Sequence, residues 1–139
     1  MKRASLLVLA LTLTLFAGAC GDSDTVLTKL NGAWAIDLNA TIENNPEMKK
    51  SIPDGEAGNM ARSMLEGMLG SMELTFDTKA GTVSGSFGGQ SFEAQKYGEA
   101  KVNGDNVELT VNGESSTITV KDNEMRMKSG AGIVVFTRK

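Results

Sequence analysis

The dominant pattern in this chain is an alternation of apolar and polar residues with the period of a β-strand. Trp34, Ile36 and Leu38 alternate with small or polar neighbours, which predicts a first strand that buries one face. From residue 72 onwards similar segments follow one another, separated by turn signals such as Asn112-Gly113. The alternation predicts eight strands, at residues 34–38, 72–77, 82–87, 91–102, 107–111, 116–120, 125–127 and 133–138.

The pattern changes between the first and second expected strands, where residues 44–71 predict a helical insertion. Asn45 followed by Pro46 is typical of a helix start and predicts a short helix over residues 46–50. A second helix is expected over residues 56–71. Its apolar residues recur at spacings of three and four and form one stripe, made of Met60, Met64, Leu65, Met68, Leu69 and Met72. Glycines weaken this helix, so packing of the stripe is expected to hold it.

Evenly spaced strands joined by short turns favour an antiparallel up-and-down barrel, because closure removes the exposed edges of a long open sheet. We therefore predict a mainly β fold, an eight-stranded antiparallel up-and-down barrel with the helical insertion between strands one and two. An irregular alternation in the fourth strand predicts a bend or bulge near Gly98. A strongly curved open sheet covered by the helix is the alternative that the pattern leaves open.

The first 20 residues have the organisation of an export signal. Lys2 and Arg3 precede an apolar run at residues 6–16, and small residues then lead to Cys20, the only cysteine in the chain. The run is about half as long as a membrane-spanning helix. This segment resembles the signal peptide of bacterial lipoproteins, which implies acylation of Cys20 after removal of residues 1–19. An ordinary secretory signal that leaves a free thiol is the alternative.

The resemblance to lipoproteins implies an organisation in three parts and a place in the cell envelope. We expect residues 1–19 to be the signal peptide, residues 20–29 a polar lipidated tether, and residues 30–139 the folded domain with its helical insert at residues 44–71. Aspartate after the acylated cysteine is the usual inner-membrane signal in Gram-negative lipoproteins. Gly21 stands there instead, which implies the outer membrane if the source is Gram-negative.

Composition and charge argue against nucleic acid as a partner and against several kinds of catalysis. The net charge is −3, and loss of residues 1–19 removes two basic residues and no acidic one. A nucleic-acid interface needs a basic face instead. The chain has no histidine, which excludes imidazole-based nucleophilic or metal sites. Acidic residues such as Glu93, Glu108 and Glu114 fall opposite the apolar strand positions and are interpreted as solvated. We expect a non-enzyme without cofactor or resident metal.

One pair of positions resembles the calycin group, which contains the lipocalins. Gly32-Ala33-Trp34 on the first strand matches their Gly-X-Trp motif, and Arg138 ends the last strand. The resemblance implies a lipocalin-like barrel in which Trp34 lies at the closed end and the guanidinium of Arg138 packs over the indole. Such a cation–π contact is worth about 0.5 to 2 kcal/mol. Gly32, Trp34 and Arg138 are therefore expected to be structural.

The unusual feature of the insertion is the number of methionines on one face of its second helix. They are interpreted as an apolar stripe that packs over the barrel, because methionine fills irregular gaps well. The same stripe can form the wall of a pocket for a lipophilic ligand. A third possibility is capture of Cu(I), for which thioethers are soft ligands.

These patterns together predict a membrane-anchored, non-catalytic lipoprotein that binds or carries a small hydrophobic ligand at the cell envelope. Its expected partners are the membrane, through the lipid anchor, the ligand, and an envelope protein. The alternative is a structural or protein-interaction lipoprotein whose barrel is filled by its own side chains. The expected ligand-binding residues come from the second helix and from inward-facing strand positions: Met60, Met64, Leu65, Met68, Phe76, Phe87 and Phe92.

Overall fold

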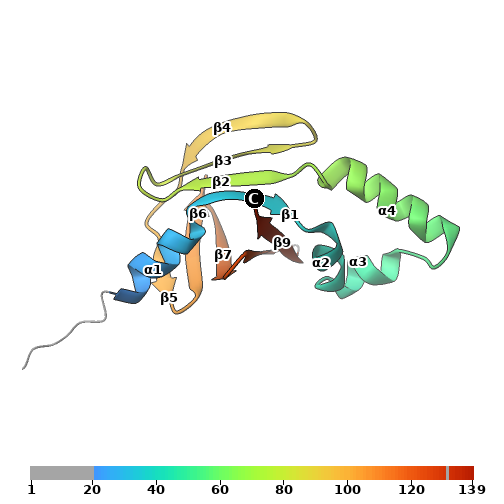
Figure 1. The fold of residues 1–139 in the computed structure, drawn as a ribbon, viewed down its shortest axis with the longest axis horizontal. Coiled ribbons are helices and arrows are strands. Elements are labelled where there is room, and N and C mark those ends of the chain that lie inside the picture. Colours follow the sequence, from blue (N-terminus) through green and yellow to red (C-terminus); the bar gives the residue numbers. More distant parts are fainter. Residues whose placement is uncertain (1–20, 131) are drawn as a thin grey trace, which may run out of the picture.

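The computed structural model describes residues 21–130 and 132–139 and is built around one curled antiparallel sheet (Figure 1). The strands of this part of the chain are β1 (Gly32–Ile36), β2 (Glu73–Asp77), β3 (Thr82–Phe87), β4 (Gln90–Lys96), β5 (Lys101–Asn103), β6 (Asn106–Val111), β7 (Glu114–Lys121), β8 (Glu124–Ser129) and β9 (Gly132–Arg138). Its helices are α1 (Gly21–Leu30), α2 (Leu38–Glu43), α3 (Pro46–Ser51) and α4 (Glu56–Leu69). The prediction of a mainly β antiparallel fold is confirmed.

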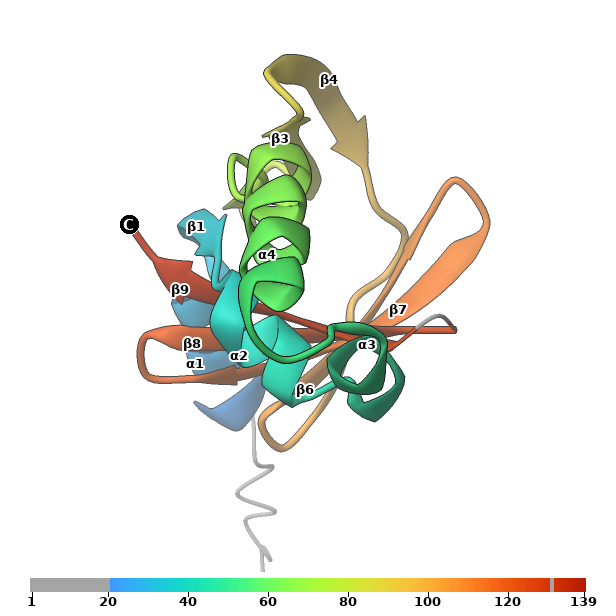
Figure 2. The same ribbon diagram turned by 90° about the vertical axis from the view of Figure 1, so that its right-hand side faces the viewer.

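The first and last strands lie together in the middle of the sheet. The strand order is β4-β3-β2-β1-β9-β8-β7-β6-β5, so every neighbouring pair except β1 and β9 is consecutive in the chain. Trp34 of β1 stands opposite Leu74 of β2 on one side and Arg138 of β9 on the other. The sheet curls around its concave face and forms a half-barrel, with β2, β3 and β4 facing β6 and β7 across the core (Figures 1 and 2).

The sheet has nine strands rather than the eight that were predicted. The difference arises in the stretch expected as a single strand over residues 91–102. There β4 pairs with β3, and the chain then leaves β3 and continues as β5 along β6. The change of partner falls at Gly98, whose backbone N–H donates to the carbonyl of Thr110 at 2.8 Å. The bend predicted near Gly98 therefore divides the strand in two.

The helical insertion begins earlier than predicted. Leu38 was expected in the first strand, but β1 ends at Ile36 and α2 starts at Leu38. The cause is the side chain of Asp37, which accepts a hydrogen bond from the backbone N–H of Ala40 at 2.9 Å and caps the new helix. The two helices expected within residues 44–71 are present as α3 and α4.

Residues 21–30 form the helix α1, where the sequence predicted a polar tether at residues 20–29. The expectation that this stretch is too polar to pack is wrong, because Val26 is buried, as is Leu30 at the end of the same helix. Their spacing of four places both on one face of the helix. That face covers one end of the half-barrel, beside β5, β6 and β7. The stretch expected as a tether is therefore a helix that packs on the half-barrel.

The core fills the concave side of the sheet at the end covered by α1. Side chains from both flanks of the half-barrel meet there, and most of them come from the alternating positions that predicted the strands. The largest fully buried side chains of this core are Trp34, Phe136, Leu30, Ile118, Met125, Val107 and Val120. Ile42 of α2 and Val135 of β9 are also fully buried, but they lie where α2 packs against β9 and not in this cluster.

Candidate functional site

The end of the half-barrel under α1 is closed by Trp34 and Arg138. The indole of Trp34 is fully buried and donates from Nε1 to the carbonyl of Leu30 at 2.9 Å. The guanidinium carbon of Arg138 lies 4.3 Å from the centroid of the Trp34 ring, a cation–π geometry. The predicted contact between these two side chains is confirmed.

Arg138 also joins the C-terminal end of α1 to the sheet. Its guanidinium donates to the carbonyl of Asn31 at 3.0 Å and to the carbonyl of Lys29. A cation at this position complements the partial negative charge of the helix C-terminus. Gly32 has φ of +118° and leaves room for the guanidinium, since a Cβ there would lie 3.0 Å from its Nη1. Gly32, Trp34 and Arg138 thus form one structural closure.

An apolar cavity of about 240 Å³ lies on the concave face beyond this closure. It is open to solvent and is bounded by side chains from both flanks of the half-barrel. The lining residues are Met72, Leu74, Phe76, Val83, Phe92, Gln95, Leu109, Val111, Ser116, Ile118 and Met127. Ligand sites for drug-sized molecules occupy about 300 to 1,000 Å³, so this volume suits a smaller or slender ligand.

Gly85 shapes the wall of the cavity on the β3 side. It stands opposite Leu74 on β2 and Phe92 on β4, and the β3–β4 register shifts next to it. A Cβ at this position would come within 2.8 Å of the Phe92 ring and 2.2 Å of the carbonyl oxygen of Glu73. The absence of a side chain at Gly85 therefore lets the Phe92 ring lie across β3 and form part of the apolar wall.

The cavity lining carries no formal charge. Its two polar residues are Gln95 and Ser116. The Oε1 atom of Gln95 accepts a hydrogen bond from Nδ2 of Asn112 at 2.9 Å, which bridges β4 and the β6–β7 turn. Nearby, burial raises the pKa of the Tyr97 phenol, and the negative charge of Asp77 adds to the effect. Tyr97 therefore keeps its proton to a higher pH than a free phenol, and the cavity lining offers no charged side chain to pair with an ionic ligand.

The structure brings together only part of the predicted ligand-binding set. Phe76 and Phe92 line the cavity, whereas Phe87, at the end of β3, is 48% exposed. On α4, Leu65 is half-buried. Met60, Met64 and Met68 are 70%, 64% and 59% exposed, and none of these four residues lines the cavity.

The expectation that the methionine stripe packs over the barrel is wrong for Met60, Met64 and Met68, whereas Met72, which follows α4, does line the cavity. Helix α4 extends away from the sheet at the end of the molecule opposite α1 (Figures 1 and 2). Gly58 packs tightly against the preceding loop, since a Cβ there would lie 1.8 Å from the carbonyl oxygen of Pro53. The buried face of α4 therefore meets this loop, and the methionines face solvent.

The cavity-lining residues missing from the prediction lie mostly on strands. The predicted strands include Leu109 and Ser116, but the methionine helix was expected to supply a wall of the pocket. The structure supplies that wall from β6, β7 and β8 instead, through Leu109, Val111, Ile118 and Met127. The period-two parity of residues 107–111 and 116–120 was the available signal.

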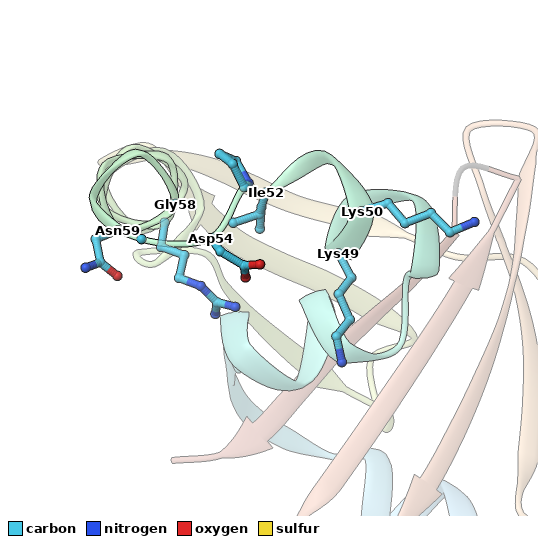
Figure 3. A pocket seen from close by; sticks show the side chains of 9 residues that line it. Lys49, Lys50, Ile52, Asp54, Gly58 and Asn59 are labelled. Atoms are coloured by element: carbon cyan, nitrogen blue, oxygen red, sulfur yellow. The ribbon is translucent and has the colours of Figure 1, made fainter.

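A second hollow, of about 500 Å³, lies between α3 and α4 and is mainly polar (Figure 3). Lys49 and Lys50 border it but point in different directions. Lys49 pairs with Glu43 at 2.5 Å, and this hydrogen bond and charge lower the pKa of Glu43. Lys50 pairs with Glu47 at 3.6 Å. These two lysines are therefore already partnered and do not converge on a common ligand.

Within residues 21–130 and 132–139, no group of three or more acidic, cysteine or histidine side chains is arranged to hold a metal ion. None of the helices in that part of the chain has the length and apolar character needed to cross a membrane. The predicted signal peptide, residues 1–19, and the predicted acylation site, Cys20, lie outside the described residues.

Comparisons with protein-family models, curated proteins and solved structures find no match to this chain. The resemblances to lipoproteins and to the calycin group therefore stay predictions. They depend on the Cys20 segment and on the Gly32, Trp34 and Arg138 positions.

Proposed function

We propose that this protein is a non-catalytic, lipid-anchored binding module that holds a small uncharged hydrophobic ligand. The observation that carries the proposal is the apolar cavity on the concave face of the half-barrel. All but two of its lining side chains are apolar, and an apolar ligand that displaced water from them would gain about 25 cal/mol per Å² of buried surface. Gln95 and Ser116 supply the few polar groups that orient a ligand in such sites.

The proposal includes a lipocalin-like barrel that is closed by one bent strand. In this interpretation β4 and β5 are the two halves of one strand that bends at Gly98. Counted as one, they give the predicted eight strands. The hydrogen bond from Gly98 to Thr110 and the one between Asn112 and Gln95 support it, because both join β4 or its continuation to β6 and its turn. Closure of this kind protects the edges of β4 and β5.

The proposed anchor is an acylated Cys20 at a cell-envelope membrane, the outer membrane in a Gram-negative source. Helix α1 begins at Gly21, so an acyl chain on Cys20 would attach to the closed end of the half-barrel without a flexible spacer. Helix α4 lies at the opposite end of the long axis (Figure 1). The closed end would then lie next to the membrane, with α4 directed away from it.

A matched pair of phenylalanine variants tests the proposed ligand site. The chain from residue 20, with Cys20 replaced by serine to remove the acylation site, contains every described element of the fold. We expect it to bind the uncharged fluorophore N-phenyl-1-naphthylamine with a rise in fluorescence. Phe92→Ala removes a wall of the cavity and should weaken binding about tenfold, while the exposed Phe87→Ala should change it less than twofold.

Two results would contradict the proposal. One is equal affinity of both variants for the fluorophore, and the other is no saturable rise in fluorescence with the parent chain. A fluorophore held on the exposed methionines of α4 would also leave Phe92→Ala unaffected. Circular dichroism of each variant establishes that the fold is retained.

The alternative function is a structural or protein-interaction lipoprotein with a filled barrel. One observation favours it: the half of the concave face nearest α1 is packed solid by Trp34, Val120 and Phe136, each fully buried. Under this alternative the remaining cavity is a packing defect. The parent chain would then show no saturable binding of an apolar probe.

A further inference from the structure

The leucines and the methionines of α4 differ in how far they are exposed to solvent. Leu65 and Leu69 are half-buried. Met60, Met64 and Met68, four residues apart from one to the next, are 59% to 70% exposed. If α4 covered the barrel, as the sequence predicts, packing would account for methionine at these positions. Because they face solvent instead, packing no longer accounts for methionine at these three positions.

The property that distinguishes methionine from leucine at an exposed position is its thioether sulfur. Thioethers are soft ligands that select Cu(I) over harder cations such as Mg²⁺ and Ca²⁺. Glu56 lies four residues before Met60, so a carboxylate continues the same line along the helix. Arg62 and Glu66 are each two residues from Met64 and so do not face it. The exposed face therefore presents a row of soft donors with an anion at one end.

The helix geometry limits how many of these sulfurs can share one ion. Side chains four residues apart have Cβ atoms about 5 to 6 Å apart, and each methionine sulfur extends about 3 Å beyond its Cβ. Two neighbouring sulfurs can therefore meet at one ion. Met60 and Met68 are separated by about 12 Å along the helix axis, which is too far for their sulfurs to meet. Met72 lies beyond the end of α4 and lines the apolar cavity, so every possible pair within the exposed row contains Met64.

We propose that the exposed face of α4 binds one Cu(I) ion through the thioether of Met64 and that of either Met60 or Met68. The site is independent of the apolar cavity, because none of the three methionines lines it. The two pairs are alternatives that share Met64, so the helix holds one ion at a time.

Leucine variants test this assignment, because leucine retains an apolar side chain and high helix propensity and removes only the sulfur. The parent is again the chain from residue 20 with Cys20→Ser, which eliminates a competing thiol. Anaerobic Cu(I) is titrated against the chromogenic chelator bicinchoninate, and Ag(I) serves as a redox-inert substitute. NMR of ¹³C-methyl-labelled methionine identifies the sulfurs that bind. Met127→Leu, inside the cavity, is the matched control.

The expected result depends on position. Met64→Leu should lower the affinity more than tenfold, whereas Met60→Leu or Met68→Leu should each lower it only about twofold, since one of two equivalent pairs remains. The double variant Met60→Leu/Met68→Leu should match Met64→Leu, and Met127→Leu should match the parent. Unchanged affinity in Met64→Leu, equal losses in the three single variants, or no Cu(I) binding by the parent would overturn the assignment.

Discussion

The two ends of the half-barrel differ in how their side chains are held. At the α1 end, Trp34 is enclosed on several sides, by the cation of Arg138, the carbonyl of Leu30 and the strands β2 and β9. At the α4 end, Met60, Met64 and Met68 have solvent around most of their surface. The comparison teaches that side chains with several specific partners stabilise the fold, while an amphipathic stripe alone does not reveal what covers it.

The largest effect should come from removing the centre of the closed end. Trp34→Ala is expected to lower the free energy of unfolding by about 3 to 5 kcal/mol, because it leaves a cavity in a fully buried position. Urea denaturation measures this difference. A loss below about 1 kcal/mol would mean that Trp34 is not enclosed as the structure shows.

Arg138 should contribute less than Trp34 but through two separable interactions. Arg138→Met is expected to cost about 1 to 3 kcal/mol, since it removes both the charge over the indole and the hydrogen bonds to the end of α1. Arg138→Lys retains a charge but not the planar fork of donors, so its free energy of unfolding should lie between those of the parent and Arg138→Met. Hydrogen exchange in α1 should accelerate in Arg138→Met. Unchanged exchange there would contradict the role of Arg138 at the helix end.

The pH dependence of stability should show a smaller effect, confined to alkaline solution. Burial first and the charge of Asp77 second raise the pKa of Tyr97 in the folded protein above that of the unfolded chain, which is about 10. The resulting contribution to stability is complete below the unfolded pKa and is lost as the pH rises through the folded pKa. Tyr97→Phe should remove this loss. Equal alkaline slopes for parent and variant in urea denaturation would contradict it.

The smallest effect should come from the exposed methionines, at the opposite end. Replacing Met60, Met64 and Met68 together by alanine is expected to change the free energy of unfolding by less than about 1 kcal/mol, because exposed substitutions alter stability little and alanine favours helix. The same urea experiment measures it. A loss as large as that of Trp34→Ala would show that the α4 methionines are packed in solution.

The sequence predicted the strands of the sheet better than the helices of the insertion. The strands over residues 107–111 and 116–120 were predicted well, because a sheet with one buried face imposes a strict alternation. Leu38 was assigned to a strand because it continued the alternation, but the cap formed by Asp37 starts a helix there instead. A local hydrogen bond of this kind competes with periodicity and is not visible in the apolar pattern.

The site was predicted less completely than the fold, for a related reason. Phe76 and Phe92 were identified correctly as facing the concave side, since strand parity determines the face. The α4 stripe was predicted as a helix face, but its partner surface depends on how the chain leaves Pro53, where Gly58 packs against the loop. Val26 was overlooked because it lies within an otherwise polar stretch, and only its spacing of four from Leu30 indicates a helix face.

The most direct test of the central claim, that the cavity holds an apolar ligand, is native mass spectrometry of the protein purified from its natural host. The parent should carry an additional mass from a bound hydrophobic molecule. Ser116→Trp, which fills the cavity, should lack it, while Ser115→Trp, one residue along on the exposed face, should retain it. A mass without ligand in the parent, or the same bound molecule in Ser116→Trp, would contradict the account.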